Sequence, residues 1–417
     1  MTYAPFASPS ATGPAEEIDV AIVGAGFGGI AMGTRLKREG RRTFAILERA
    51  QDVGGCWRDN SYPGCACDVP SHLYSLSFAL NPDWTRTYSP QPEIWSYLQR
   101  VARDEGLTDH IRFGHELQSA TWDPATSRWQ ITTPLGAFAA RALVSAAGPL
   151  TEPKLPEIPG LAEFEGTLFH SARWNHDHDL TGQRVAVVGT GASAIQFIPE
   201  IQSRVGQMHV FQRTAPWVLP RTDRPITAVE RFVFRRVPGT QRLMRRAVYW
   251  AREAAALPMR YPFLAPVVAT IGRVHLRAQV RDPELRRTLT PTFKPGCKRL
   301  LLSNTYLRAL DQPNVEVIAD GLAEVRGNTV ISRNGIEREV DTIILGTGFE
   351  VTDVPIAHHI FDADGRSLSE HWADGMEAHR ATTVAGFPNL FLLLGPNAGL
   401  GHTSVVYMAE AQAHYAM

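Results

Sequence analysis

Residues 18–48, IDVAIVGAGFGGIAMGTRLKREGRRTFAILE, decide the expected fold of this 417-residue chain. The apolar run 18–23 predicts a buried parallel strand, and a glycine-rich turn follows it directly. The apolar-periodic segment 30–40 predicts a helix, and a second strand, 42–47, ends in Glu48. This order of strand, glycine turn, helix and strand is typical of a dinucleotide site.

Three glycines and one carboxylate give this turn its chemistry. Gly24 permits the tight turn, Gly26 lets backbone amides approach a pyrophosphate, and Gly29 lets the helix lie close to the strand. The helix N-terminus turns its positive dipole end toward the anion. Glu48, 24 positions after Gly24, is expected to accept hydrogen bonds from a ribose diol.

A second unit of the same kind follows at residues 184–211, with the turn GTGAS at 189–193. Arg213 lies 24 positions after the first glycine of this turn, the offset that Glu48 has in the first unit. A carboxylate suits a free ribose diol, whereas a guanidinium suits a 2′-phosphate. We therefore expect FAD on the first unit and NADPH on the second. The alternative interpretation of Arg213 is an ordinary surface arginine.

The composition predicts a chain with large cores and two or three domains. Its formal net charge is zero and 44% of its residues are hydrophobic, so composition gives no reason to expect a nucleic-acid partner. The four cysteines lack CxxC spacing, which indicates reduced thiols in a cytoplasmic protein and no metal site. The spacing of Cys65 and Cys67 is poor for disulfide-reductase chemistry. Residues 1–17 predict a disordered tail, and residues 261–271 are too short to span a bilayer.

The remaining patterns predict an α/β fold with two Rossmann-like dinucleotide-binding domains and a helical insert. The FAD-binding domain is expected to comprise residues 18–150 and 341–417, and the NADP-binding domain residues 151–220 and 291–340. A proline-rich run at 149–159 suggests the boundary between them. The apolar strand 341–349 is expected to return to the flavin sheet, as is 142–148.

The insert, expected at 221–290, is strongly basic. Residues 221–287 hold 15 arginines, no lysine and five acids, a formal charge near +10. Apolar residues recur at helical spacing, which predicts amphipathic helices with basic outer faces; they are Leu243, Ala247, Trp250, Ala254 and Leu257. One interpretation is a solvated face, and the other is docking on an anionic membrane surface or partner.

Over residues 20–415 the sequence resembles the class B flavoprotein monooxygenases, specifically the Baeyer–Villiger monooxygenases. Besides the two nucleotide turns, two motifs carry the resemblance: Gly54-Gly55-x-Trp57 with Tyr62-Pro63-Gly64 and Asp68, and Phe164-x-Gly166-x-x-x-His170-x-x-x-Trp174. Related N- and S-oxidising enzymes have Tyr or Phe where Trp174 stands, so tryptophan favours the Baeyer–Villiger branch. Asn175 departs from the usual Pro or Asp, and family members usually continue past the last helix with a tail that helps close the substrate pocket.

The resemblance implies an NADPH- and O2-dependent enzyme that inserts oxygen next to a ketone carbonyl, giving an ester or lactone through a C4a-peroxyflavin. Arg299 would stabilise the peroxide anion, because a guanidinium stays cationic and offers several donors. Asp68 would hold Arg299 against the flavin edge, although a turn or cap residue is the alternative interpretation. Lys298 and Arg213, with Thr214, would hold the 2′-phosphate.

The family motif at residues 164–174 implies a link between the two domains through Phe164, Gly166, His170 and Trp174, with a purely structural His170 as the alternative. Two other functions stay open: an N- or S-oxygenating flavin monooxygenase, and a flavoprotein that reduces O2 without productive oxygenation. The expected cofactor contacts are Gly24, Gly26, Gly29, Glu48, Gly55, Trp57, Asp68, Tyr74, Gly189, Thr190, Gly191, Ser193, Arg213, Thr214, Lys298 and Gly348.

Overall fold

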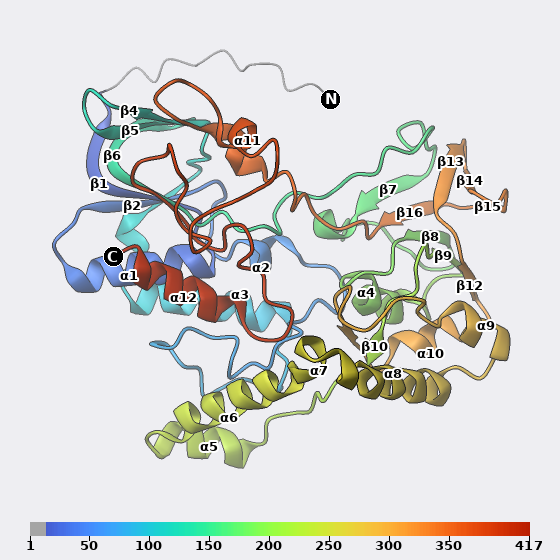
Figure 1. Ribbon diagram of the computed structural model, residues 1–417. Coiled ribbons are helices and arrows are strands. Elements are labelled where there is room, and N and C mark those ends of the chain that lie inside the picture. The colour runs from blue at the N-terminus through green and yellow to red at the C-terminus, as the bar shows by residue number, and fades with distance from the viewer. Residues whose placement is uncertain (1–13) are drawn as a thin grey trace.

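A computed structural model describes residues 14–417, which form two α/β halves with a helical arm along one side (Figure 1). Most of the predicted N-terminal tail lies outside the described residues. The first strand begins at Glu16, two residues earlier than the sequence predicts.

The first half is built on an eight-stranded mixed sheet. Its order is β17-β4-β5-β6-β1-β2-β3, and β18 also pairs with β6. The strands are β1 (Glu16–Val23), β2 (Phe44–Glu48), β3 (Ile111–Phe113), β4 (Ser119–Asp123), β5 (Arg128–Thr133), β6 (Gly136–Ser145), β17 (Ile360–Phe361) and β18 (Leu390–Leu392). The first part of β6 pairs with β5 in antiparallel fashion, whereas its last three residues pair with β18 in parallel.

Alternating residues of the central strands supply two cores. Ile22 and Ile46 face the core shared with α1 (Phe27–Glu39), α3 (Gln91–Asp104) and α12 (Val405–Tyr415). Ala21 and Leu47 face the opposite core, which contains the fully buried Trp129. This period of two explains why both strands read as continuous apolar runs.

The second half is a five-stranded parallel sheet in the order β12-β9-β8-β16-β7. Helices α4 (Ala194–Ile201) and α10 (Tyr306–Leu310) share one core with it, and a three-stranded antiparallel sheet shares the other. The strands are β7 (Thr167–His170), β8 (Arg184–Val188), β9 (Gln207–Phe211), β12 (Val315–Ile318), β13 (Leu322–Arg326), β14 (Thr329–Ser332), β15 (Glu337–Glu339) and β16 (Thr342–Leu345).

The expected return of residues 341–349 to the flavin sheet is wrong. β16 pairs with β8 and β7 of the second sheet, so the boundary placed at residue 341 is also wrong. A fully buried strand such as TIIL carries no information about which sheet it joins, because every residue is apolar or small in either place. The strand that returns to β6 is β18.

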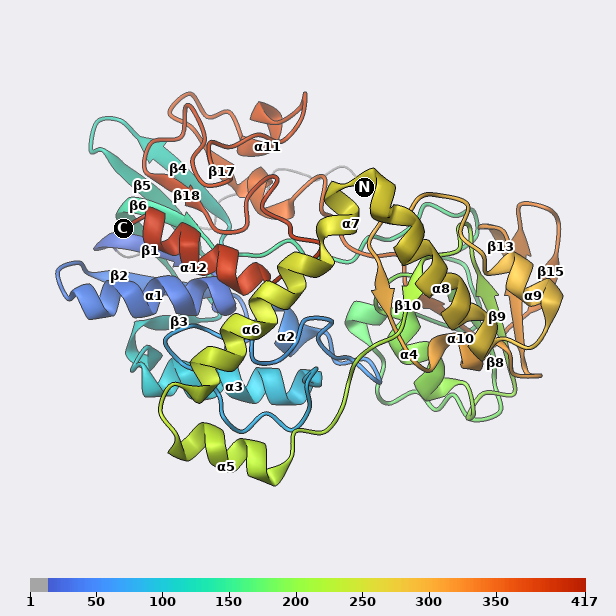
Figure 2. The ribbon, with the colours of Figure 1, turned by 60° about the horizontal axis from the view of Figure 1, so that its bottom comes forward.

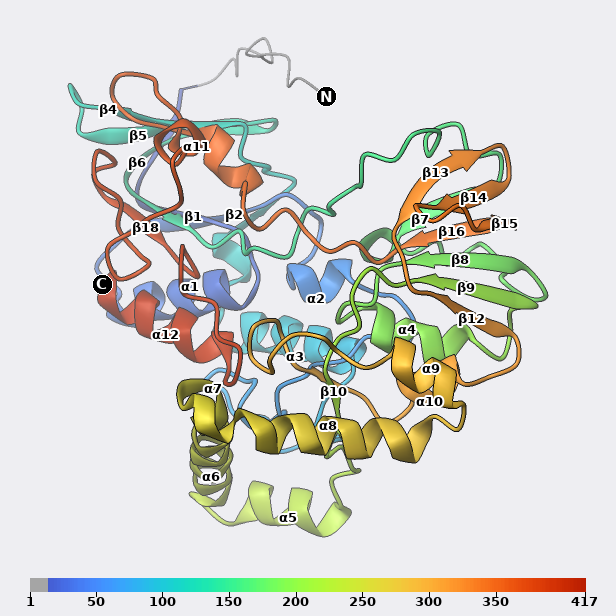
Figure 3. The same ribbon diagram turned by 45° about the vertical axis from the view of Figure 1, so that its right-hand side comes forward.

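The insert contains five α-helices, which Figures 2 and 3 show running across both halves. They are α5 (Ala228–Arg236), α6 (Thr240–Ala255), α7 (Leu257–Arg260), α8 (Ala265–Gln279) and α9 (Pro283–Thr288). The chain enters and leaves the insert side by side, because β10 (Val218–Leu219) pairs in parallel with β11 (Leu301–Leu302). Among the described residues no single helix could cross a membrane; only a pair bent by 105°, Thr240–Arg260 with Ala265–Gln279, passes by length and composition.

The outer face of α6 carries the exposed Arg242 and Arg246, as predicted, but the apolar stripe lies on the same face and not inward. Leu243 and Trp250 of its apolar stripe are 69% and 68% exposed, whereas Arg245 is 8% exposed on the inward face. Arg245 donates to the carbonyls of Leu73 (3.0 Å) and Ser75 (2.7 Å). Helix α6 therefore turns Arg245 toward a polar loop, while Val248 and Tyr249 of the same helix pack against the first apolar core.

Two antiparallel linkers join the halves: Pro153 forms a bridge with Phe349, and Lys154 N donates to Gly348 O (2.9 Å). His170, at the end of β7, places its ring 6.0 Å from the ring of Phe349. Its Nδ1 accepts from the amide of Ala172 (3.0 Å). Burial lowers the pKa of His170 to about 4.

Replacing Arg245 with methionine is expected to lower the free energy of unfolding by about 3 kcal/mol, because it leaves the buried Glu410 without its cation and the loop carbonyls without a donor. Urea unfolding of the purified protein measures the change. Arg246→Met is the matched control, since Arg246 is exposed on the same helix and should change stability by less than about 0.5 kcal/mol. Equal losses in both variants would contradict the assignment.

Replacing His170 with asparagine is expected to flatten the acid dependence of stability. Unfolded histidine takes up its proton near pH 6.5, whereas folded His170 stays neutral until about pH 4. The unfolded state therefore binds more protons between these values, and stability falls as pH falls, by about 2 kcal/mol from pH 7 to 5. Urea unfolding at pH 7 and pH 5 measures the free energy of unfolding of wild type and of His170→Asn. Groups that titrate alike in both proteins cancel when the two are subtracted. Parallel pH profiles would refute the prediction.

Candidate functional site

The first glycine turn has the geometry of an anion site. Gly26 caps α1 without any side-chain hydrogen bond to the first-turn amides. A Cβ at Gly29 would lie 1.9 Å from the carbonyl oxygen of Gly24, so only glycine lets the helix start this close to β1. A helix N-terminus with free amides and a bare backbone fits a pyrophosphate.

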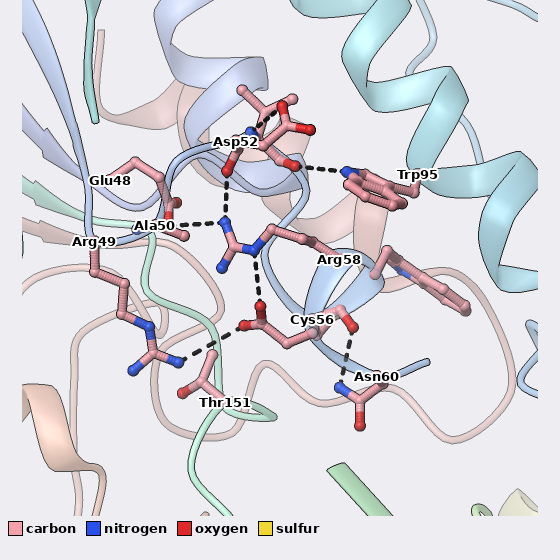
Figure 4. Close-up of polar contacts among 12 residues, drawn as sticks. Glu48, Arg49, Ala50, Asp52, Cys56, Arg58, Asn60, Trp95 and Thr151 are labelled. Carbon is pink, nitrogen blue, oxygen red and sulfur yellow. Dashed lines mark hydrogen bonds and ion pairs between the residues drawn. The ribbon is translucent and has the colours of Figure 1, made fainter. Parts of the chain in front are cut away.

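Glu48 lies buried beside this turn, at the end of β2 (Figure 4). Its Oε2 accepts from the amide of Ala25 (2.8 Å), and its Oε1 accepts from Ala50 (3.0 Å) and from Arg58 (2.9 Å). Each carboxylate oxygen has two lone pairs, so Oε2 keeps one for a ribose hydroxyl. The carboxylate is thus fixed in place, as a ribose-binding residue requires.

Sequence reasoning missed Arg58. This arginine belongs to the short helix α2 (Cys56–Asp59), where it also contacts Asp59 (2.8 Å) and the carbonyl of Asp52 (Figure 4). It neutralises the buried Glu48 and anchors the loop beneath the turn. The only sequence signal was a single arginine inside an irregular glycine-rich stretch, which has no periodicity to interpret.

The loop after the turn brings the next predicted contacts together. A Cβ on Gly55 would lie 3.3 Å from Cα of Gly26, which places this residue against the first turn. The indole nitrogen of Trp57 donates to the hydroxyl of Tyr74 (2.9 Å), and their rings meet edge to face at 5.6 Å. Burial raises the pKa of Tyr74 well above its usual value, so the hydroxyl stays protonated.

The second glycine turn repeats the pattern in the other half. Gly189 has φ +110°, and a Cβ there would lie 2.4 Å from the carbonyl oxygen of Gly346. Thr190 and Gly191 follow, and Ser193 is the N-cap of α4, with no side-chain hydrogen bond to the amides of the first turn. Nothing lies within 4 Å of a Cβ built on Gly191, which leaves room for a phosphate.

Three predicted phosphate ligands lie on two neighbouring segments. Arg213 and Thr214 precede β10, and Lys298 precedes β11. Because these two strands pair in parallel, the segments run side by side in the same direction. Arg213 and Lys298 are exposed, and neither forms an ion pair within the part of the chain that the structure describes.

Asp68 and Arg299, 231 residues apart in sequence, form an ion pair. Oδ2 of Asp68 accepts from Nε of Arg299 (3.1 Å) and also from its Nη2. The negative charge of Asp68 raises the pKa of Arg299, which therefore stays cationic. The pair joins the loop after the first turn to the segment that follows the insert and precedes β11.

The domain-linking motif lies in the second half, next to the linkers. Phe164 packs at the core beneath the antiparallel sheet, and a Cβ on Gly166 would lie 2.3 Å from the carbonyl oxygen of Asp341. Trp174 packs against Phe169 and against Phe197 of α4. Gly348 lies in the linker, where a Cβ would meet nothing within 4 Å.

Three of the four cysteine thiols, those of Cys56, Cys65 and Cys67, have raised pKa values. Burial raises the pKa of Cys56 and of Cys65 to about 12, and the pKa of Cys67 is also raised. All four cysteines are free thiols. Among residues 14–417 no group of three or more His, Cys, Asp or Glu side chains could hold a metal ion.

Comparison with known proteins agrees with this geometry. The family model described as "Flavin-binding monooxygenase-like" matches residues 17–248. A Baeyer–Villiger monooxygenase of Streptomyces coelicolor is 52% identical over 401 residues, which cover 96% of this chain and 77% of the relative. A Baeyer–Villiger monooxygenase of Pseudomonas aeruginosa is 47% identical over 405 residues, which cover 97% and 77%.

A solved structure is similar along the same length. It is cyclohexanone monooxygenase from Rhodococcus sp. Phi1 bound to NADP+, with a TM-score of 0.84, 29% identity, and coverage of 97% of this chain and 84% of that one. Because the family model matches more than half of the residues and close relatives align with nearly all of them, this chain belongs to the flavin-binding monooxygenase-like family, in its Baeyer–Villiger branch.

Proposed function

We propose that this chain uses FAD, NADPH and O2 to insert one oxygen atom next to the carbonyl of a ketone, giving an ester or lactone. Ketone, O2, NADPH and one proton then balance ester, NADP+ and water. Family membership and the names of the relatives support this reaction. The observation that carries it is the Asp68–Arg299 pair, which brings a fixed cation to the loop that follows the first nucleotide turn.

The chain's own residues bind and orient in this proposal. The first-turn amides hold the FAD pyrophosphate and Glu48 holds the ribose, while the second turn and Ser193 hold the pyrophosphate of NADPH. The reduced flavin supplies the oxygen chemistry. Arg213, Thr214 and Lys298 contact the 2′-phosphate, for which the paired segments before β10 and β11 provide two cations.

Arg299 supplies positive charge where negative charge develops on oxygen. A cation fixed before the reaction stabilises this charge without reorganisation. Asp68 fixes the guanidinium through the two donors Nε and Nη2, leaving Nη1 for the reacting oxygen. We assign Arg299 the catalytic role and Asp68 the role of its orienting partner.

The substrate in this proposal is a small-molecule ketone. The similar solved structures are named as cyclohexanone monooxygenase and steroid monooxygenase, and they align with 96–97% of this chain at 28–32% identity. Their names favour ketone oxidation over N- or S-oxygenation.

The apolar stripe of α6 is proposed to contact an anionic membrane surface. The exposed Leu243 lies between the exposed Arg242 and Arg246, the exposed Trp250 follows Arg246 by one helical turn, and Phe263 beyond α7 is 76% exposed. Apolar and aromatic side chains flanked by arginines suit the boundary between lipid headgroups and acyl chains.

Vesicle sedimentation tests this contact. The protein is expected to sediment with vesicles that contain phosphatidylserine but not with phosphatidylcholine alone, and added salt should release it. Trp250→Ser should weaken binding, whereas Leu155→Ser, at an exposed leucine of the linker region, should not. Binding that is indifferent to anionic lipid would refute the contact, as would self-association abolished by Trp250→Ser, which would assign the stripe to a second copy.

Arg299→Ala is expected to retain FAD but to lower ester formation on the order of 100-fold, because the developing negative charge loses its cation. NADPH oxidation, hydrogen peroxide and ester are measured together on a panel of cyclic, linear and aryl ketones. The electrons taken from NADPH should then reduce O2 to hydrogen peroxide, with NADP+ as the other product, and little ester should form.

Two neighbouring cations serve as comparisons for this variant. Lys298→Ala should raise the KM for NADPH and leave the ester yield per NADPH unchanged. Lys294→Ala, at an exposed lysine on the same segment, should behave as wild type. Ester formation by Arg299→Ala at the wild-type rate would disprove the catalytic assignment. A wild type that forms no ester from any ketone in the panel would disprove the proposed function.

A further inference from the structure

Residues 62–68, here called the bridging loop, leave the first half and lie on helix α4 of the second. Gly64 has φ +75°, and a Cβ there would lie 2.8 Å from the carbonyl oxygen of Gln196 and 2.8 Å from Cγ of Glu200. Tyr62 packs edge to face on Phe197. The loop therefore contacts the helix with its backbone, which requires a close and specific fit.

Gln196 uses both ends of its amide to hold this loop. Its Oε1 accepts from the hydroxyl of Tyr62 (3.0 Å) and from the amide of Ala66 (3.3 Å), and its Nε2 donates to the carbonyl of Ala66 (2.9 Å). All three bonds cross from one half to the other. Gln196 lies in the first turn of α4, three residues after Ser193, so it moves with the proposed coenzyme site.

The other end of the bridging loop holds the proposed catalytic cation. Asp68 binds Arg299, and the carbonyl of Cys67 accepts from Arg221 (2.9 Å). Only one residue separates Ala66 from Asp68, so their Cα atoms cannot be more than about 7 Å apart. Because Cys67 is buried and its amide donates to Ser89 O (3.0 Å), this short segment cannot absorb a displacement by bending freely.

We propose that Gln196 is a positioning residue that couples coenzyme binding at the start of α4 to the placement of Arg299. A shift or stiffening of α4 passes through Ala66 to Asp68 and so to the guanidinium. This inference rests on the proposed function. The enzyme would therefore direct oxygen into ester rather than hydrogen peroxide only while the coenzyme holds α4 in place.

Hydrogen exchange of the holoenzyme tests the physical link without turnover. NADP+ is expected to slow exchange in peptides covering residues 62–68 by about tenfold in wild type. Gln196→Met keeps the volume but removes all three bonds, and should abolish this protection while NADP+ still binds. Gln196→Glu keeps the two accepted bonds and should retain part of it. Gln202→Met is the matched control, because Gln202 ends the same helix and binds Asn314 in its own half.

A double-mutant cycle tests whether Gln196 acts through Asp68. Gln196→Met should raise the fraction of NADPH lost as hydrogen peroxide about threefold or more, while anaerobic flavin reduction changes less than about twofold. In an Asp68→Asn background, Gln196→Met should cause no further loss to hydrogen peroxide, because Asp68 no longer connects the loop to Arg299.

Three results would overturn the proposal: an unprotected bridging loop in wild type with NADP+ bound, wild-type protection in Gln196→Met, or additive effects in the cycle. Failure of the proposed function itself looks different. Wild type would then form no ester from any ketone, or would not bind NADP+, whatever residue stands at position 196.

Discussion

The ion pair between Asp68 and Arg299 is the interaction on which the proposed site depends. A guanidinium beside a flavin must be held against thermal motion and against water, since a loosely placed cation stabilises developing charge poorly. Arg299 is about half exposed, so burial alone does not fix it; the two donated hydrogen bonds do. Everything that positions Asp68 therefore also positions the cation.

The two halves supply different parts of this arrangement. The first half provides the turn at residues 24–29 and the carboxylate Glu48, which Arg58 and two amides fix in place. The second half provides α4 and the segments before β10 and β11, one of which carries Arg299. Since the site is divided in this way, the linkers and the bridging loop that join the halves set its geometry.

Local sequence patterns predicted the nucleotide units well. The second unit, predicted at residues 184–211, begins with β8 at Arg184 and ends with β9 at Phe211, and the residues of the Asp68–Arg299 pair were named from the family resemblance alone. The predictions from periodicity were wrong where an element's position depends on which other element packs against it. β16 reads as buried in either sheet, and the stripe of α6 reads as a core face although it is exposed. Periodicity shows which residues of an element share a face, but not which other element packs against that face.

The inward position of Arg245 on α6 and the hydrogen bonds of Gln196 have the same physical cause. Residues 54–78 are largely irregular, so many of their backbone groups find no partner in a sheet or helix, and buried polar groups require partners. Side chains from distant elements supply them: Gln196 binds Ala66, Arg221 binds Cys67, and Arg245 binds Leu73 and Ser75. Arg245 thus points inward because the loop carbonyls need a donor, and Glu410 balances its charge. Because these donors come from the second half and the insert, the conformation of the loop that carries Asp68 depends on contacts from all three parts.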